Sequence, residues 1–322
     1  IFLAFCFLLY PLVAAFSTYR RVSFQTPLYL FWIAVFLTVS AFYFLHSQTE
    51  KKPEQIFTVL ALSAGLMLCF LAPLCTGISW DDETHYIRSV QVFSNLTRAD
   101  IVMQHYAYQN PLKFSFSVDV LGERSAYLND LYQNSQFAYM NANTSIESLV
   151  VYRRMGYYLP GAVIFLGRLL RLPFVSVFLL GKTSILLCYV ALVRVAIKRL
   201  KTGKMILATI ALFPTGVFLA SNYSCDSWIT AWVMVGMSYF FAQLQEPDQP
   251  LTVKDTIIIM GSLVLGLGPK AIYFPLFALL LLLPKSKFSS VQQYRKYLVI
   301  VSVAAVLVLI SFVIPMLFDS VP

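Results

Sequence analysis

Gly77-Ile-Ser-Trp-Asp-Asp-Glu-Thr-His-Tyr86 is the stretch around which the chain is organised. Apolar sequence ends just before it, and a long polar segment follows it as far as Arg153-Arg154. Three consecutive acids therefore stand at the exit of an expected membrane helix. The residues after them have the period of a helix, with an apolar stripe made of Tyr86, Ile87, Val90 and Phe93. This stripe predicts a helix that lies in the bilayer interface.

The polar residues of the same helix are expected on its other face. Asp81, His85 and Arg88 are spaced i, i+4 and i+7, so they share that face and would be turned toward a cavity. A simpler interpretation is helix capping, since Ser79-x-x-Asp82 has the form of a capping box and acids favour a first turn. Capping accounts for one or two acids, but not for a histidine and an arginine beside them.

Composition defines the broad class. Apolar residues make up 59% of the chain, charged residues 12%, and the mean hydropathy is +0.72, against about 45–50% and about 25% in soluble proteins. The net charge of +9 does not indicate nucleic-acid binding, because the basic residues flank apolar runs. The five cysteines are scattered and form no CxxC pair, so neither a zinc site nor a disulfide framework is indicated.

The apolar runs predict an all-α, polytopic transmembrane helix bundle. A span needs about 20 mainly apolar residues. Because the chain begins inside an apolar run without a methionine, residues 1–322 are expected to be one membrane domain from a longer protein. The expected spans cover about 1–16, 27–45, 56–75, 174–196, 205–220, 227–244, 255–268, 271–283 and 297–317.

Charge decides the topology around residue 160. Residues 194–204 carry five basic side chains and no acid, which places this segment in the cytoplasm by the positive-inside rule. If residues 155–170 crossed the membrane, this basic segment would share a side with the large polar loop. Residues 155–172 are therefore expected to form an interfacial or re-entrant helix, and residues 76–154 an extracytoplasmic loop carrying interfacial helices.

This topology brings charged residues from separate turns to one membrane face. Asp81 and Asp82, Asp226 and Lys270 would all lie on the outer side. Each has an ordinary alternative role: Asp226 could cap the following helix, and Lys270 could extend to the interface. Arg153 and Arg154 could be interface anchors. Together, acids and a lysine at one membrane surface predict a site, in which the acids act as base or metal ligands and the cations hold a phosphate.

At these residues the chain resembles the DUF2142 family of bacterial polytopic membrane proteins, which are similar to the GT-C superfamily of glycosyltransferases. The family pattern resembles Pro-Asp-Glu-Pro-Ala-His-Tyr, and the matching stretch is Trp80-Asp-Asp-Glu-Thr-His-Tyr86. Asp81 takes the Asp position, Asp82 that of Glu, and His85 that of His. Further likeness lies in three short segments: Tyr157-Tyr-Leu-Pro160, Ser221-Asn-Tyr-Ser-Cys-Asp226, and Lys270 with Tyr273-Phe-Pro275. The resemblance covers about residues 56–320.

The resemblance implies a GT-C-like membrane glycosyltransferase of the bacterial cell membrane. Such an enzyme moves a sugar, with inversion, from a polyprenyl-phosphate carrier to an envelope glycan, lipid or protein on the outer face. Asp81 would be the general base, and Asp82 would orient it or help to bind a divalent metal, Mg or Mn. The residues implied in substrate binding are His85, Arg88, Arg153, Arg154, Tyr157, Asp226 and Lys270.

Other functions use the same features. A transporter or flippase for a lipid-linked sugar would need cationic and aromatic outer groups without chemistry, but the sequence shows no clear internal repeat. A polysaccharide polymerase or ligase also joins lipid-linked glycans outside the membrane. A non-catalytic envelope polysaccharide assembly protein would use the acids only as helix caps.

Overall fold

A computed structural model describes residues 2–21, 26–47, 50–75, 81–101 and 152–318. Within these ranges the regular structure is helical, without a β-strand, as the sequence predicts. The helices are α1 (Phe2–Tyr19), α2 (Thr26–His46), α3 (Pro53–Cys75), α4 (Asp82–Phe93), η2 (Tyr152–Arg154), α7 (Met155–Leu169), α8 (Phe174–Arg199), α9 (Lys204–Ala211), α10 (Pro214–Ala220), α11 (Asp226–Gln245), α12 (Val253–Leu267), η3 (Gly268–Leu276), α13 (Phe277–Leu280), η4 (Lys285–Lys287) and α14 (Val291–Phe318).

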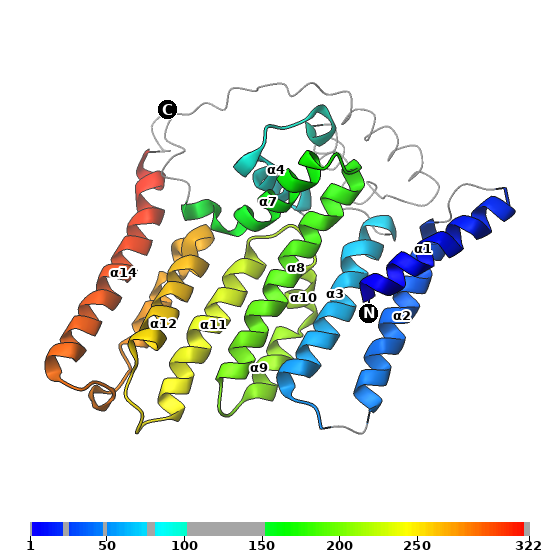
Figure 1. Cartoon of the computed structure of the whole chain (residues 1–322). Coiled ribbons are helices and arrows are strands. Elements are labelled where there is room, and N and C mark those ends of the chain that lie inside the picture. The colour runs from blue at the N-terminus through cyan, green and yellow to red at the C-terminus, as the bar shows by residue number, and fades with distance from the viewer. Residues whose placement is uncertain (1, 22–25, 48–49, 76–80, 102–151, 319–322) are drawn as a thin grey trace.

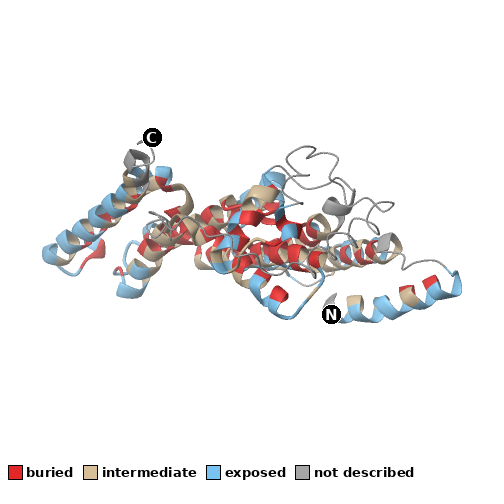
Figure 2. Ribbon diagram, turned by 90° about the horizontal axis from the view of Figure 1, so that it is seen from above, coloured by how far each residue is buried: buried red, intermediate tan, exposed pale blue. Residues whose placement is uncertain are grey.

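The upright helices stand side by side in one row, and α4 and α7 lie across their upper ends (Figure 1). Seen from above, the row is elongated, with buried residues gathered in its middle and mostly exposed helices at both ends (Figure 2). The described residues contain five segments long and apolar enough to cross a membrane: Leu28–His46, Pro53–Phe70, Phe174–Arg199, Val253–Leu280 and Val291–Ser311. The chain is therefore a polytopic membrane protein.

Two of the expected spans differ from continuous helices. The span predicted over 205–220 is divided into α9 and α10, because Pro214 lacks an N–H and forces Phe213 into extended backbone. The span predicted over 271–283 consists of η3 and the short α13. Leu251 N donates to Lys287 O at 2.8 Å, so after α13 the chain returns to the end of the row at which α12 begins.

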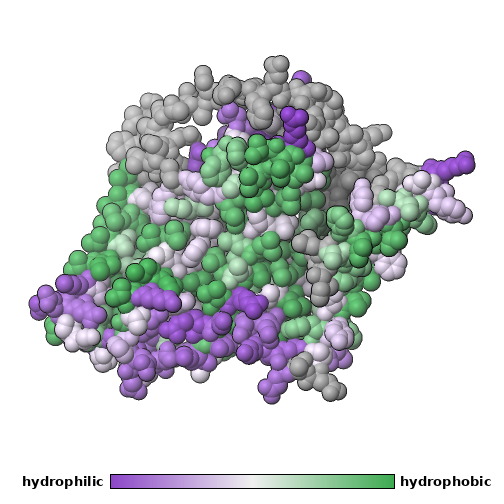
Figure 3. Space-filling model, viewed as in Figure 1, coloured by the Kyte–Doolittle hydropathy of each residue, from purple (hydrophilic) through white to green (hydrophobic). Residues whose placement is uncertain are grey.

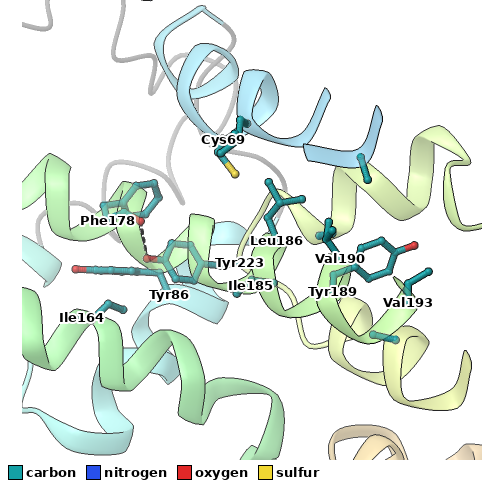
Figure 4. Packing of buried hydrophobic residues seen from close by; sticks show 14 of the residues in the cluster. Cys69, Tyr86, Ile164, Phe178, Ile185, Leu186, Tyr189, Val190, Val193 and Tyr223 are labelled. Atoms are coloured by element: carbon teal, nitrogen blue, oxygen red, sulfur yellow. Dashed lines mark hydrogen bonds between the residues drawn. The ribbon is translucent and has the colours of Figure 1, made fainter. Parts of the chain in front are cut away.

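Aromatic side chains fill the middle of the row where α4 meets α8. The rings of Tyr86 and Phe178 lie 5.1 Å apart, and that of Tyr223 lies 5.2 Å from Tyr86 (Figure 4). The Tyr223 hydroxyl donates to Phe178 O at 2.7 Å. Gly181 makes room for it, since a Cβ there would lie 2.0 Å from the Tyr223 hydroxyl oxygen. The turn before α11 is thereby packed onto α8.

A buried carboxylate joins α4 to α7. Asp100 accepts from Arg168 Nη2 at 2.8 and 2.7 Å, from the Tyr86 hydroxyl at 2.7 Å, and from Thr97 N at 2.7 Å. The side chains of Arg168 and Asp100 are 4% and 0% exposed. A buried charge is stable only with such partners. This network holds α4 and α7 together across the ends of the other helices.

The Tyr86 hydroxyl gives a test of this network. We expect Tyr86→Phe to lower the free energy of unfolding by about 1.5–3 kcal/mol, because it removes a hydrogen bond to a charged group inside the protein. Thermal unfolding in detergent measures the change. Tyr43→Phe, at a side chain that is 75% exposed, is the matched control and should differ little from the parent. Equal stability of the two variants would contradict a stabilising role for the network.

The opposite end of the row is polar and carries the basic residues of 194–204. Lys201 Nζ lies 2.9 Å from Glu246 Oε1, and Arg199 Nη1 lies 3.5 Å from Glu246 Oε2. Lys287 Nζ donates to the Glu246 and Gln249 carbonyls, each at 2.5 Å. These bonds tie three turns together at the hydrophilic lower edge, beneath a hydrophobic band (Figure 3).

Candidate functional site

The candidate site begins where α4 begins. Asp81 is the N-cap residue and has a left-handed backbone, φ 60°, which aspartate tolerates better than most residues. Its carbonyl accepts from His85 N at 2.9 Å, and its side chain is exposed and makes no capping bond. The predicted capping residue Ser79 lies outside the described residues. The exposed carboxylate of Asp81 stands beside the polar face of α4.

The polar face of α4 meets α7 at one hydroxyl. His85 Nδ1 and the Tyr157 hydroxyl are 2.7 Å apart, their rings are stacked, and Arg88 Nη1 donates to the same hydroxyl at 3.4 Å. Gly161 permits this approach, because a Cβ there would lie 2.5 Å from Ser89 O. The shared face predicted for His85 and Arg88 is confirmed. In the predicted apolar stripe, Tyr86, Ile87 and Val90 are buried, but Phe93 is 47% exposed.

An ion pair completes this side of the site. Lys270 Nζ lies 2.5 Å from Asp226 Oδ1, and both side chains are partly exposed, at 42% and 34%. Lys270 has non-helical backbone, φ −139° and ψ 74°, after Pro269 interrupts the helix. Asp226 is the first residue of α11, where its charge also favours the helix dipole. Cys225, just before it, lies against the Tyr157 hydroxyl.

The electrostatics of His85 show that these groups share one region. Burial is the main cause that lowers the pKa of the His85 imidazole from 6.5, followed by the positive charge of Arg88; Asp81 and Asp226 oppose the shift, and Lys270 adds to it. Three elements, α4, α11 and η3, therefore bring charged groups within electrostatic range of one imidazole, and α7 adds the neutral hydroxyl of Tyr157. Burial also raises the pKa of the Tyr157 hydroxyl, so Tyr157 stays protonated.

The lowered pKa of His85 predicts a pH dependence. The unfolded chain binds a proton near pH 6.5 and the folded chain only at lower pH, so stability is full above 6.5 and falls as the pH drops from there toward the folded value. We expect His85→Gln to lose less stability than the parent protein when the pH is lowered, because glutamine does not titrate. Thermal unfolding of both proteins at pH 5.5 and 7.5 measures it, and an identical decrease in both would contradict the assignment.

Asp82 lies apart from this cluster. Its side chain is 0% exposed, with Oδ2 at 2.5 Å from Lys182 Nζ and Oδ1 accepting from Tyr223 N at 2.5 Å. Lys182 is itself buried, donates to Asn222 Oδ1 at 2.9 Å, and stands over the Phe178 ring. The two adjacent acids of the motif therefore have different surroundings, one exposed and one inside the bundle.

The arginine pair adjoins the site from the side of η3. Arg153 and Arg154 are half-buried and form η2 with Tyr152, directly before α7. A Cβ on Gly268 would lie 2.4 Å from Tyr152 O, so η2 and η3 are in close contact. Both arginines thus lie on η2, which contacts η3 and directly precedes α7.

Most of the predicted site residues are brought to this end of the row, and some residues were missed. Asp81, His85, Arg88, Tyr157, Asp226 and Lys270 converge, and Arg153 and Arg154 border them. The sequence interpretation did not assign Lys182, Asn222 or Cys225 to the site, although the last two lie in the quoted segment Ser221-Asn-Tyr-Ser-Cys-Asp226. Lys182 carried a signal, because a lone lysine within the apolar run 174–193 calls for a partner.

A divalent metal does not fit the pair Asp81 and Asp82. Both carboxylate oxygens of Asp82 are engaged, one by Lys182 and one by the Tyr223 amide. In the described part of the chain, no group of three or more His, Cys, Asp or Glu side chains could hold a metal ion.

The fold and the site define a class, that of α-helical polytopic membrane proteins with a charged cluster at one end of the bundle. The chain belongs to the DUF2142 family, described as a predicted membrane protein, whose match covers residues 75–319. The matched region holds every residue of the candidate site. Curated proteins and solved structures give no match.

Proposed function

We propose that the protein is a GT-C-type glycosyltransferase that moves a sugar from a polyprenyl-phosphate donor to a hydroxyl of an envelope glycan, lipid or protein. The observation that carries the proposal is the convergence of an exposed carboxylate, Asp81, with His85, Arg88 and Lys270 at one end of the helix row. Inverting transfer needs a base for the acceptor and cations for the departing phosphate. The cluster supplies both.

The proposed step assigns a role to each group. The acceptor oxygen attacks the anomeric carbon while the bond from that carbon to the phosphate oxygen breaks. The acceptor proton passes to the Asp81 carboxylate, and the bond electrons leave with the phosphate. Lys270, with Arg88, Arg153 and Arg154, balances the negative charge that develops on the phosphate. Asp226 orients Lys270 through their ion pair, and His85 and Tyr157 shape the sugar site.

Asp82 is assigned a positioning role. It is the first residue of α4 and anchors it to Lys182 on α8 and to Tyr223 before α11. Fixing the start of α4 fixes the left-handed N-cap that presents Asp81.

The proposed orientation places the site on the outer face of a bacterial cell membrane. The basic residues 194–204 lie at the opposite end of the row, with Lys285 and Lys287 on the same side. Cytoplasmic loops carry such an excess of basic residues. In this orientation residues 76–154 are extracytoplasmic, and α7 with residues up to 172 lies in the interface.

The test is donor transfer in vitro. Purified protein in detergent or nanodiscs is given a panel of polyprenyl-phosphate sugars and an envelope extract as acceptor, and labelled product is measured. Product that depends on one donor supports the proposal. If the protein moves an intact lipid-linked sugar across the membrane of proteoliposomes but transfers none, the proposed transferase is wrong and the protein is a flippase. If it shows neither activity, the remaining function is that of an assembly protein.

A further inference from the structure

A second feature lies beside the candidate site, an apolar cleft between α12 and α14. Its cavity measures 410 Å³, and its wall includes Tyr152, Val264, Leu307, Val308, Ser311 and Ile314. The two polar side chains among these are already engaged: the Tyr152 hydroxyl donates to Val264 O at 2.5 Å, and the Ser311 hydroxyl to Val308 O at 2.7 Å. The wall therefore presents hydrocarbon to whatever fills the cleft.

The length of the cleft matches one leaflet of a bilayer. On α14 it runs from Ala304 to Ile314, which is roughly 15 Å at the rise of an α-helix. The hydrocarbon core of a bilayer is about 30 Å thick. A chain lying along the cleft would thus span about half of the membrane, on the side where the candidate site lies.

Cationic residues adjoin one wall residue of the cleft. Tyr152 forms part of its wall and is followed directly by Arg153 and Arg154. Tyr152 also packs on Gly268, two residues before Lys270. A lipid whose chain lies in the cleft would therefore carry its headgroup to positive side chains, which is the complementarity that a phosphate needs.

We propose that this cleft binds the isoprenoid chain of a polyprenyl phosphate, with the phosphate at Lys270, Arg153 and Arg154. The assignment rests on the proposed function, since it locates the carrier of the same donor. An uncharged lipid would fill the cleft but would not pair with the cations. Inorganic phosphate would pair with the cations but would leave the cleft unfilled. A phosphorylated long chain satisfies both.

Photo-crosslinking tests the cleft without requiring transfer. The full chain in nanodiscs is incubated with a polyprenyl phosphate that carries a diazirine on its chain, irradiated, and digested for mass spectrometry. We expect labelled peptides from α12 and α14, with labelling competed by unlabelled polyprenyl phosphate and not by phosphatidylglycerol. Labelling elsewhere, or equal competition by phosphatidylglycerol, would overturn the proposal and leave ordinary bilayer lipid as the occupant.

Two tryptophan variants on α14 sharpen the test. Leu307 is 60% exposed and lines the cleft, whereas Val306 is 51% exposed and does not. Leu307→Trp should weaken polyprenyl-phosphate binding about tenfold, the loss expected when about two methylene groups lose their contacts, while Val306→Trp should leave it unchanged. Equal effects would refute the cleft. If the cleft is labelled but no sugar is transferred, only the proposed transferase activity is refuted. If sugar is transferred but the labelled peptides lie elsewhere, only the cleft is refuted as the site of the isoprenoid chain.

Discussion

Lys182→Met is expected to destabilise the protein by about 3–5 kcal/mol, because it removes the cationic partner of a carboxylate that is 0% exposed. Thermal unfolding in detergent, with retention of monodisperse protein on heating, measures the change. The effect should reach α4 first, since Asp82 is its first residue and loses the contact to α8. Lys198→Met, on the same helix at an exposed position, is the matched control.

A double variant separates charge from packing. In Asp82→Asn with Lys182→Met, the neutral amide oxygen can still accept from Tyr223 N, and no buried charge is left. We expect the double variant to recover more than half of the stability lost in Lys182→Met, as buried ion pairs replaced by neutral groups often do. A double variant less stable than the single one would show that the pair contributes through something other than charge balance.

Asp81→Asn is expected to lower transfer by about 10²- to 10⁴-fold, the range for loss of a general base. Protein level and unfolding temperature should stay unchanged, because the Asp81 side chain is exposed and makes no capping bond. The measurement is labelled sugar transferred by purified protein, with surface glycan in cells as a second readout. Asp248→Asn, an exposed acid at the opposite end of the bundle, is the control. Full activity of Asp81→Asn would remove this residue from the mechanism.

The fold class, and the proximity of several of the predicted site residues, followed from patterns in the sequence. The apolar runs predicted the helices. The i, i+4, i+7 spacing placed His85 and Arg88 on one helix face, and both side chains contact the Tyr157 hydroxyl. Local irregularities were harder to predict. The break before α10 has a local cause in Pro214, and η3 contains Pro269 and Pro275, so prolines marked both places although the expected spans ran through or up to them.

The separation of Asp81 from Asp82 could not be predicted from their own segment. Adjacent residues on a helix point about 100° apart, but which of them faces the core depends on what the core offers. Here Lys182, a hundred residues later, attracts the second acid, and the left-handed N-cap leaves the first one outside. A single lysine in an apolar helix was the signal, and its partner was identified only by the tertiary structure.

The pairing of Lys182 with Asp82 also has a consequence for biogenesis. A lysine in a spanning helix costs at most about 2.5–3.5 kcal/mol on insertion scales, the value for the helix centre, and α8 follows α4 in synthesis by some eighty residues. Until α4 docks, the ammonium group of Lys182 therefore lacks its carboxylate partner. Chains in which α4 fails to dock would keep an unbalanced positive charge among the spanning helices, so insertion of α8 and docking of α4 are energetically coupled.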